Sequence, residues 1–339
     1  MSFEMSTFWA IVLLVGGLVV LWKAADLLVA GAVSLAERFG ISPLVIGLTI
    51  VAMGTSAPEV AASIAAVIRE SGQIAGGDLA IGNVFGSNIA NLALIGGICA
   101  LIRPIRVQMR ILVKEGPIML LTAFFLWPLL CDNHILRLEA IVLLCVFAIL
   151  IGLVVYGAKV EAKRNSEIAA QIDRDIKREV KIPQKPLAVS VVFVLLGLVG
   201  LAGGAKMSVE GAVFIGRLIG LSEAVIGLTI IAIGTSLPEL VTCVVAAAKG
   251  HDDISVGNLV GSNIFNTLLV TGAAGTSMPF TVSARLAGGP DYWVMVAVGV
   301  LFILAAVAGK KVLGRIGGTL LLCIYIGYTA YLLTIASGR

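Results

Sequence analysis

Charged side chains are scarce in this sequence. Asp, Glu, Lys and Arg make up only 13% of its 339 residues, against about 25% in a typical soluble domain. The charges are also clustered, which leaves many apolar stretches of about 20 residues, the length that crosses a bilayer core as a helix. This scarcity excludes a soluble globular domain. It predicts an all-α integral membrane protein whose surroundings are the lipid bilayer.

Other absences narrow the chemistry. Both histidines, His134 and His251, fall in predicted loops, and the cysteines share no metal-type spacing: they are Cys99, Cys131, Cys145, Cys243 and Cys323. A zinc, copper or iron site is therefore not expected, nor is a bound cofactor.

The net charge of +4 is too small and dispersed to indicate a nucleic-acid partner. An enzyme is not expected either, because intramembrane Ser56 and Ser236 have no His or Lys to serve as a base.

Breaks at glycine, proline and charge clusters predict ten membrane spans. They lie near 8–33, 42–68, 75–101, 111–131, 135–157, 187–213, 222–248, 253–279, 291–309 and 313–335. The connecting segments alternate between rich and poor in Lys and Arg, and the segment 158–186 holds the largest basic group. Basic loops stay in the cytoplasm. We therefore expect a multi-pass protein of the cell (inner) membrane, with both termini outside and the 158–186 loop in the cytoplasm.

The sequence contains an internal repeat. Residues 41–60 read ISPLVIGLTIVAMGTSAPEV and residues 221–240 read LSEAVIGLTIIAIGTSLPEL; farther on, GNVFGSNIAN at 82–91 matches GNLVGSNIFN at 257–266. The two GTS segments are five predicted spans apart, an odd number, so they run in opposite directions through the membrane. This predicts two inverted five-helix repeats, typical of secondary carriers with a mid-membrane site. The expected division is 1–157 for the first repeat, 158–186 for a charged linker and 187–339 for the second repeat.

Two carboxylates, Glu59 and Glu239, lie in the middle of long apolar spans. A charge at that depth costs about 2.5–3.5 kcal/mol on insertion scales and almost always serves a function. Thr and Ser stand four and three residues before each Glu, so helical spacing places their hydroxyls beside it. Proline one residue before each Glu removes a backbone N–H and frees carbonyls to tilt toward a cation. The predicted ligands in these segments are Ala52 (carbonyl), Thr55, Ser56 and Glu59, with Ala232 (carbonyl), Thr235, Ser236 and Glu239.

The second motif of each half adds a serine and an asparagine four residues apart, on one helical face. These predicted ligands are Ser87 with Asn91, and Ser262 with Asn266. The other asparagines of these motifs are expected to join helices: Asn83, Asn88, Asn258 and Asn263. An all-oxygen site with two negative charges suits a hard divalent cation such as calcium, and the same oxygens, rearranged, suit sodium.

Two charged pairs occur inside the first and sixth spans. Lys23 is three residues before Asp26, and Lys206 is four residues before Glu210. Residues at these spacings are neighbours on a helix. We expect local ion pairs near the membrane edge with a structural role, and a role in gating is the alternative.

These motifs resemble the two α-repeats of the cation/calcium antiporter superfamily, most closely the microbial sodium/calcium exchangers. The resemblance covers nearly the whole chain and implies alternating access, in which spans one and six slide against the other eight while calcium and sodium compete for overlapping sites. It implies the same twelve site residues, with the Ala52 and Ala232 carbonyls in sodium sites. Family members often carry Asp at the position of Asn266, which leaves the ion stoichiometry open.

Alternatives remain at this point. A proton/calcium antiporter would use Glu59 and Glu239 as proton carriers, although the hydroxyls of the GTS motifs favour sodium. A potassium-requiring exchanger is less favoured. A channel has no comparable need for an inverted repeat. Transport direction, affinity and oligomeric state are not indicated by the sequence.

Overall fold

The computed structural model describes residues 6–70, 73–176, 186–220, 230 and 232–336. Most of this chain is helical, and several helices contain short, wider π-helical segments (η). Up to residue 176 the helical elements are α1 (Thr7–Phe39), α2 (Pro43–Ile46), η1 (Gly47–Val51), α3 (Ala52–Thr55), α4 (Ala57–Arg69), α5 (Ile74–Ile89), η2 (Ala90–Ile95), α6 (Gly96–Ile102), η3 (Ile111–Glu115), α7 (Gly116–Leu130) and α8 (Arg137–Ile176). From residue 186 they are α9 (Leu187–Leu218), α11 (Ala232–Thr235), α12 (Leu237–Ala248), α13 (Asp252–Phe265), η5 (Asn266–Val270), α14 (Thr271–Ser277), α15 (Pro290–Ala308) and α16 (Arg315–Ala336).

Among the described residues, eight helical runs are long and apolar enough to cross a membrane. They match eight of the ten predicted spans, which confirms an all-α multi-pass membrane protein. The predicted span 222–248 begins outside the described residues, and its described part ends in the short apolar helix α12. The predicted span 253–279 corresponds to the continuous run α13–η5–α14, which is rich in buried Ser, Asn and Thr.

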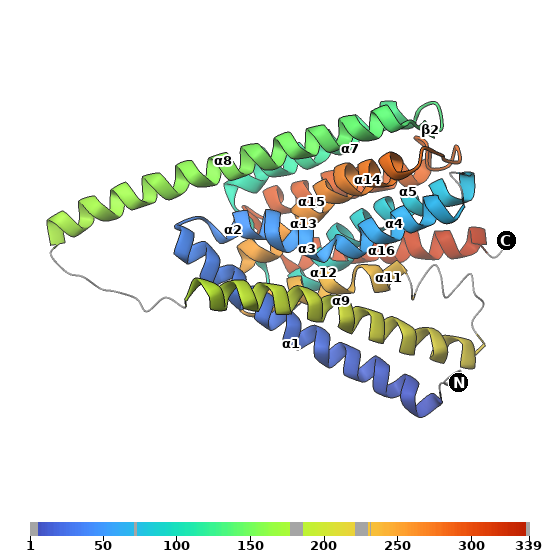
Figure 1. Cartoon of the computed structure of the whole chain (residues 1–339), viewed down its shortest axis with the longest axis horizontal. Coiled ribbons are helices and arrows are strands. Elements are labelled where there is room, and N and C mark those ends of the chain that lie inside the picture. Colours follow the sequence, from blue (N-terminus) through green and yellow to red (C-terminus); the bar gives the residue numbers. More distant parts are fainter. Residues whose placement is uncertain (1–5, 71–72, 177–185, 221–229, 231, 337–339) are drawn as a thin grey trace.

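Helix α8 is longer than the predicted span that it contains. The span was expected to end at 157, yet the helix continues to Ile176 and projects beyond the rest of the molecule (Figure 1). The first part of the expected 158–186 linker is therefore helical, and 177–185 lies outside the described residues. The start of α1 and the end of α16 lie at the opposite end of the molecule from the α8 projection (Figure 1).

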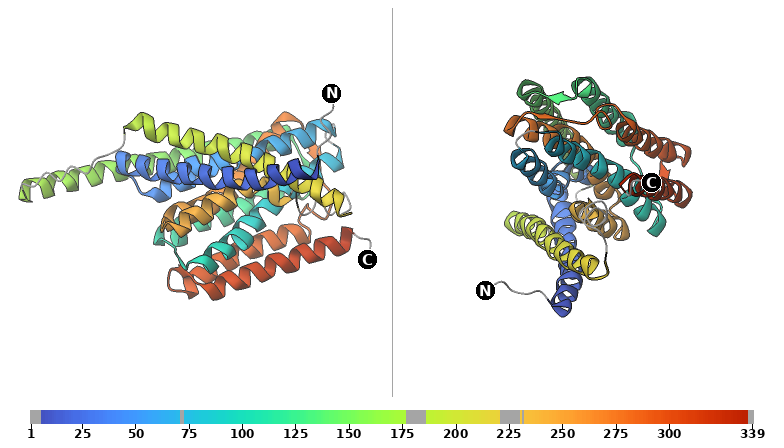
Figure 2. Two further views of the ribbon diagram at one scale, coloured as in Figure 1. Left: turned by 90° about the horizontal axis from the view of Figure 1, so that it is seen from below. Right: turned by 90° about the vertical axis from the view of Figure 1, so that its right-hand side faces the viewer.

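Helices α1 and α9 lie side by side along one edge of the molecule, and α1 packs against α12 of the block formed by the other helices (Figures 1 and 2). Small residues make their close approach feasible. A Cβ atom at Gly204 of α9 would lie 2.9 Å from both the Gly17 carbonyl oxygen and the Leu21 nitrogen of α1. An apolar cluster that includes Leu21, Leu28 and Leu201 fills the seam.

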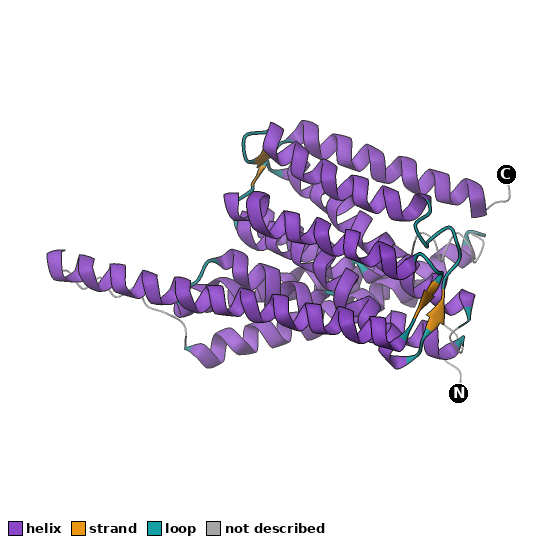
Figure 3. Cartoon of the chain, turned by 90° about the horizontal axis from the view of Figure 1, so that it is seen from above, coloured by secondary structure: helices purple, strands orange, loops and turns teal. Residues whose placement is uncertain are grey.

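Two short antiparallel strand pairs lie at opposite ends of the molecule (Figure 3). β1 (Ile105–Arg106) pairs with β4 (Val312–Leu313), and β2 (His134–Ile135) pairs with β3 (Phe280–Thr281). Side chains extend both junctions. Asp252 accepts from the Arg106 backbone N–H at 3.0 Å, and Asp78 accepts from the Ser283 backbone N–H at 2.7 Å. Each junction joins the first half of the sequence to the second.

The α1–α9 seam yields a test of packing. We expect Gly204→Ala to lower the free energy of unfolding by roughly 1–3 kcal/mol, since the new methyl group would meet the α1 backbone. Gly203→Ala is the matched control, because a Cβ there has nothing within 4 Å. Thermal unfolding of the purified protein in detergent measures the difference. Equal melting temperatures for the two variants would contradict this account of the seam.

Candidate cation site

Breaks in two helices set the geometry of the site. Ser56 stands between α3 and α4, and Ser236 stands between α11 and α12. Both breaks precede the prolines, which cannot donate a hydrogen bond to the preceding turn. Ser56 has φ −83° and ψ 3°, and Ser236 has φ −91° and ψ 7°. The two GTSxPE segments thus adopt the same local conformation.

The structure brings the two segments together in the middle of the molecule. Glu59 and Glu239 are each only 1% exposed. The Ser56 hydroxyl donates to Oε1 of Glu239 at 3.2 Å, and the Ser236 hydroxyl lies 3.5 Å from that of Ser87. Residues about 150 and 180 positions apart in sequence therefore share one polar centre.

Many oxygens of this centre have no hydrogen-bond partner within the described part of the chain. They are both carboxylate oxygens of Glu59, Oε2 of Glu239, Oγ of Ser262, and the amide oxygens of Asn91 and Asn266. Leaving a buried polar group without a partner costs about 1–3 kcal/mol, and more for a charged one. A cation bound among these oxygens would remove that cost. Five of the twelve predicted ligand residues thus contribute oxygens that the protein itself leaves without a described partner.

Wide helical turns position the asparagines. Asn91 lies within η2, and Asn266 is the first residue of η5. π-helical turns interrupt the regular hydrogen-bonding pattern and occur frequently at functional sites. A third such turn, η1, ends immediately before Ala52. Three of the four segments that carry predicted ligands therefore have a described irregular turn at or beside the ligand.

The remaining predicted ligands are less fully constrained. Ala52 is fully buried, and its carbonyl oxygen accepts from the Thr55 hydroxyl at 3.3 Å and from the Ser56 N–H at 3.0 Å. Thr235 is half-buried in α11, which begins at Ala232. The side chain of Ala232 lies outside the described residues. The structure therefore brings most of the predicted residues together, and the role of all twelve as ligands remains a prediction.

Asparagines expected to join helices do so at three positions. Asn83 donates to the Glu59 carbonyl at 3.2 Å and to Ser63 at 3.0 Å, and Asn88 donates to Thr267 at 3.1 Å. Asn258 accepts from Thr55 at 3.2 Å. Asn263 instead donates to Leu259 in its own helix, at 2.7 Å. Sequence reasoning missed that Asn83 and Asn258 hold residues of the site itself.

The donor set selects the kind of ion. In the described part of the chain, no group of three or more His, Cys, Asp or Glu could hold a metal, and the polar centre offers only oxygens and amide nitrogens. Carboxylates, hydroxyls and amide oxygens suit hard cations. With two carboxylates and no basic residue paired to either in the described contacts, the centre attracts positive charge.

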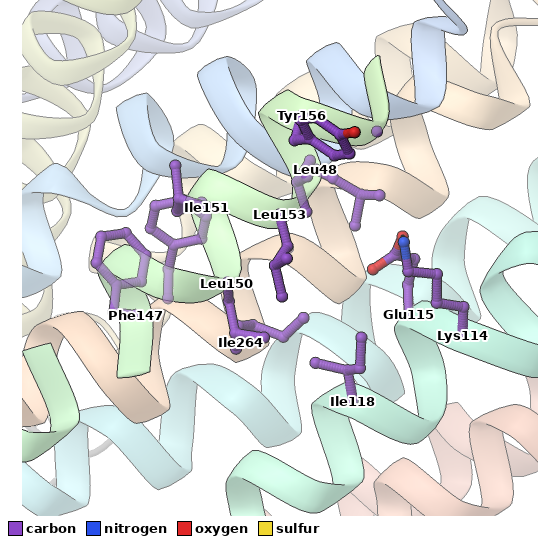
Figure 4. A pocket seen from close by; sticks show the side chains of 14 residues that line it. Leu48, Lys114, Glu115, Ile118, Phe147, Leu150, Ile151, Leu153, Tyr156 and Ile264 are labelled. Atoms are coloured by element: carbon purple, nitrogen blue, oxygen red, sulfur yellow. The ribbon is translucent and has the colours of Figure 1, made fainter. Parts of the chain in front are cut away.

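A separate cavity of about 280 Å³ lies between α8, the η3–α7 helix and α13 (Figure 4). Its wall is mainly apolar, with Leu150, Leu153 and Ile264 facing it and the polar ends of Lys114 and Glu115 at one side (Figure 4). None of the twelve predicted site residues lines it. It is therefore distinct from the polar centre.

The unsatisfied amide of Asn266 yields a test. We expect Asn266→Leu to keep or raise the melting temperature without added ions, because a buried group lacking partners disappears. The same substitution should shrink the rise in melting temperature that calcium produces, since that rise grows with ligand occupancy. Thermal unfolding with and without calcium measures both effects.

Asn263→Leu is the matched control for that experiment. It removes a described 2.7 Å hydrogen bond, so we expect a lower melting temperature without ions and an unchanged calcium effect. A full calcium effect in Asn266→Leu would remove Asn266 from the set of cation ligands.

Comparison with known proteins shows the family to which the chain belongs. The family model described as "Sodium/calcium exchanger protein" matches residues 9–156 and 189–334. The putative antiporter CaxA of Alkalimonas amylolytica is 39% identical over 313 residues, 92% of this chain and 95% of that protein. The sodium/calcium exchanger MaX1 of Methanosarcina acetivorans is 33% identical over 343 residues, 93% of this chain and 96% of that protein.

A solved structure agrees as well. The sodium/calcium exchanger from Methanococcus jannaschii superimposes with a TM-score of 0.79 at 29% identity, over 96% of this chain and 99% of that one. The sequence motifs, the polar centre and both comparisons thus agree. This chain belongs to the sodium/calcium exchanger family, within the cation/calcium antiporter superfamily.

Proposed function

We propose that this protein exchanges calcium for sodium across the cell membrane, by alternating access at the polar centre between Glu59 and Glu239. The observation that carries the proposal is the set of buried oxygens without partners on both sides of that centre. Calcium takes six to eight oxygen ligands, a number that these side chains and nearby carbonyls can supply. Sodium ions would occupy the same oxygens when calcium leaves.

The twelve predicted residues are the proposed ligands. Glu59 and Glu239 supply the negative charge. The other side-chain ligands are Thr55, Ser56, Ser87, Asn91, Thr235, Ser236, Ser262 and Asn266, and the Ala52 and Ala232 carbonyls complete the sodium sites. Two carboxylates balance one calcium ion, whereas Asn266 adds an oxygen without charge.

We further propose ten spans in two inverted repeats, covering 1–157 and 187–339. Matched ion pairs support the symmetry: Arg110 with Glu115 before α7, and Arg285 with Asp291 at the start of α15. In each pair the acid is almost fully buried, at 2% and 5% side-chain exposure. The same inverted symmetry would relate the two strand pairs, which lie one at each end of the molecule.

The orientation follows from where the basic segments meet. Glu161 of the α8 extension accepts from the Ser42 backbone N–H at 3.0 Å and pairs with Arg110 at 3.4 Å. Arg106 meets Asp252 at the same set of loops. Basic residues remain on the cytoplasmic side, so this end is proposed to be cytoplasmic. Both termini, at the other end (Figure 1), would then lie outside.

Coupling to sodium is the part of the proposal that most needs a direct test. MaX1 is named a sodium/calcium exchanger, whereas CaxA is named only a putative antiporter. We expect proteoliposomes loaded with sodium to take up radioactive calcium, and an imposed pH gradient alone to drive no uptake. Glu59→Gln and Glu239→Gln should each lower uptake at least about tenfold, because each removes a charged ligand whose loss costs more than about 1.4 kcal/mol.

Glu210→Gln is the matched control, since Glu210 is half-exposed on α9 and pairs weakly with Lys206 at 3.9 Å. Its uptake should equal that of the unmodified protein. Uptake driven by the pH gradient and not by sodium would replace the proposal with proton/calcium antiport. Full uptake by both glutamine variants would remove the carboxylates from the site.

A further inference from the structure

An ion pair joins α1 to the packed block. Oδ1 of Asp26, in the interior of α1, lies 2.7 Å from Nζ of Lys249 at the end of α12. Local pairing of Asp26 with Lys23 was expected from sequence spacing, and the described ion pair is instead with Lys249. The contact bridges two helices that are more than 220 residues apart in sequence. It connects the edge pair α1–α9 to the helix that carries Glu239.

Helix α12 is covered along the face that ends in Lys249. Pro238, Thr242, Val245 and Ala246 are buried, at spacings that place them on one side of a helix. Val245 and Ala246 belong to the same apolar cluster as Leu21, Ala25 and Leu28 of α1. Helix α1 therefore packs against α12 between Glu239 and Lys249.

The matching face of α4 is open. The residues 180 positions earlier are Pro58, Ala62, Ala65, Ala66 and Arg69. Ala62 and Arg69 are exposed and the other three are half-buried, and only Glu59, Ser63 and Val67 of α4 are buried. The sequences are related but their burial differs. The face of α12 is thus covered by α1, whereas the equivalent face of α4 is left uncovered.

We propose that Asp26 and Lys249 are gate residues, whose ion pair holds α1 against α12 and closes the approach to the cation site from the Lys249 end. This inference rests on the proposed function, because a gate presupposes a site that opens alternately to the two ends. When α1 slides along α12, the pair must separate. The strength of this ion pair therefore contributes to the equilibrium between the state closed at the Lys249 end and the state open at that end.

The internal repeat predicts an equivalent contact in the other half, but the residues at its two positions do not have opposite charges. In the opposite state, α9 would seal α4 as α1 now seals α12, and the residues at the equivalent positions would approach each other. These are Lys206, 180 positions after Asp26, and Arg69, 180 positions before Lys249. Both are positive, and Glu210, which lies 3.9 Å from Lys206, offsets only part of their repulsion, whereas Asp26 and Lys249 attract each other in the present state. The chain is biased toward the state closed at the Lys249 end.

Thiol labelling from the two sides of the membrane tests the gate without requiring transport. The five native cysteines are replaced by alanine, and Thr242→Cys reports on the sealed α12 face. A membrane-impermeant thiol reagent is added from the Lys249 end. We expect Asp26→Asn or Lys249→Gln to raise the rate of labelling at position 242 by about two- to fivefold, because an exposed ion pair contributes a free energy of that size. The charge exchange Asp26→Lys with Lys249→Asp should restore the slow rate.

Lys23→Gln is the control, because it removes a charge one turn from Asp26 without touching the described ion pair. It should leave the labelling rate unchanged. An unchanged rate in both Asp26→Asn and Lys249→Gln, or failure of the charge exchange to restore the slow rate, would overturn the gate.

A second variant tests the one-sided bias. Arg69→Glu would replace the repulsion from Lys206 by an attraction in the opposite state. We expect faster labelling at 242 from the Lys249 end and slower labelling of Ala62→Cys from the Arg69 end. No shift would overturn the bias. If the labelling rates change as expected but the protein transports no calcium in proteoliposomes, the gate is supported and the proposed function is overturned.

Discussion

Everything else in this structure is arranged around two carboxylates that are buried in the middle of a membrane without a basic partner in the described contacts. Glu59 and Glu239 are each 1% exposed, and three of their four oxygens accept no described hydrogen bond. A carboxylate at that depth almost always serves a function, and its charge must be neutralised by a bound cation or by a proton. The broken helices and the wide π-helical turns concentrate further oxygens at the same depth. The cost of burying these carboxylates and oxygens without partners thus favours the binding of a cation among them.

The chemistry of the site could be predicted from the sequence because polar residues are conspicuous inside apolar spans. Glu59, Asn91 and their counterparts stand out by composition alone, and the repeated motif shows that both halves contribute. Helical spacing then places hydroxyls beside each carboxylate. The direct contact between Ser56 and Glu239 follows once two inverted halves are required to meet. These inferences need only local spacing and the cost of burying charge.

Other features depend on which helices become neighbours, and spacing along one helix does not reveal that. Asp26 was assigned to Lys23 because the two are close in sequence, but the three-dimensional neighbour is Lys249. Asn258 was expected to join helices in general, whereas its role is to hold Thr55. The strand pairs are two residues long, too short to leave a pattern. The helical continuation of α8 beyond 157 could not be fixed from the sequence, because charged residues mark the edge of the bilayer and not the end of a helix.

The strand pairs have a consequence for how the protein is made. β1 and β2 belong to the first half of the chain, and their partners β4 and β3 belong to the second. The ribosome therefore completes the first half of the chain before the partner strands exist, so β1 and β2 remain unpaired, at opposite ends of the molecule, until the second half is made. Only when β3 and then β4 emerge are both ends fastened. Assembly is thus completed by the last spans synthesised. A prematurely terminated chain lacks the strand pair at one or both ends of the molecule.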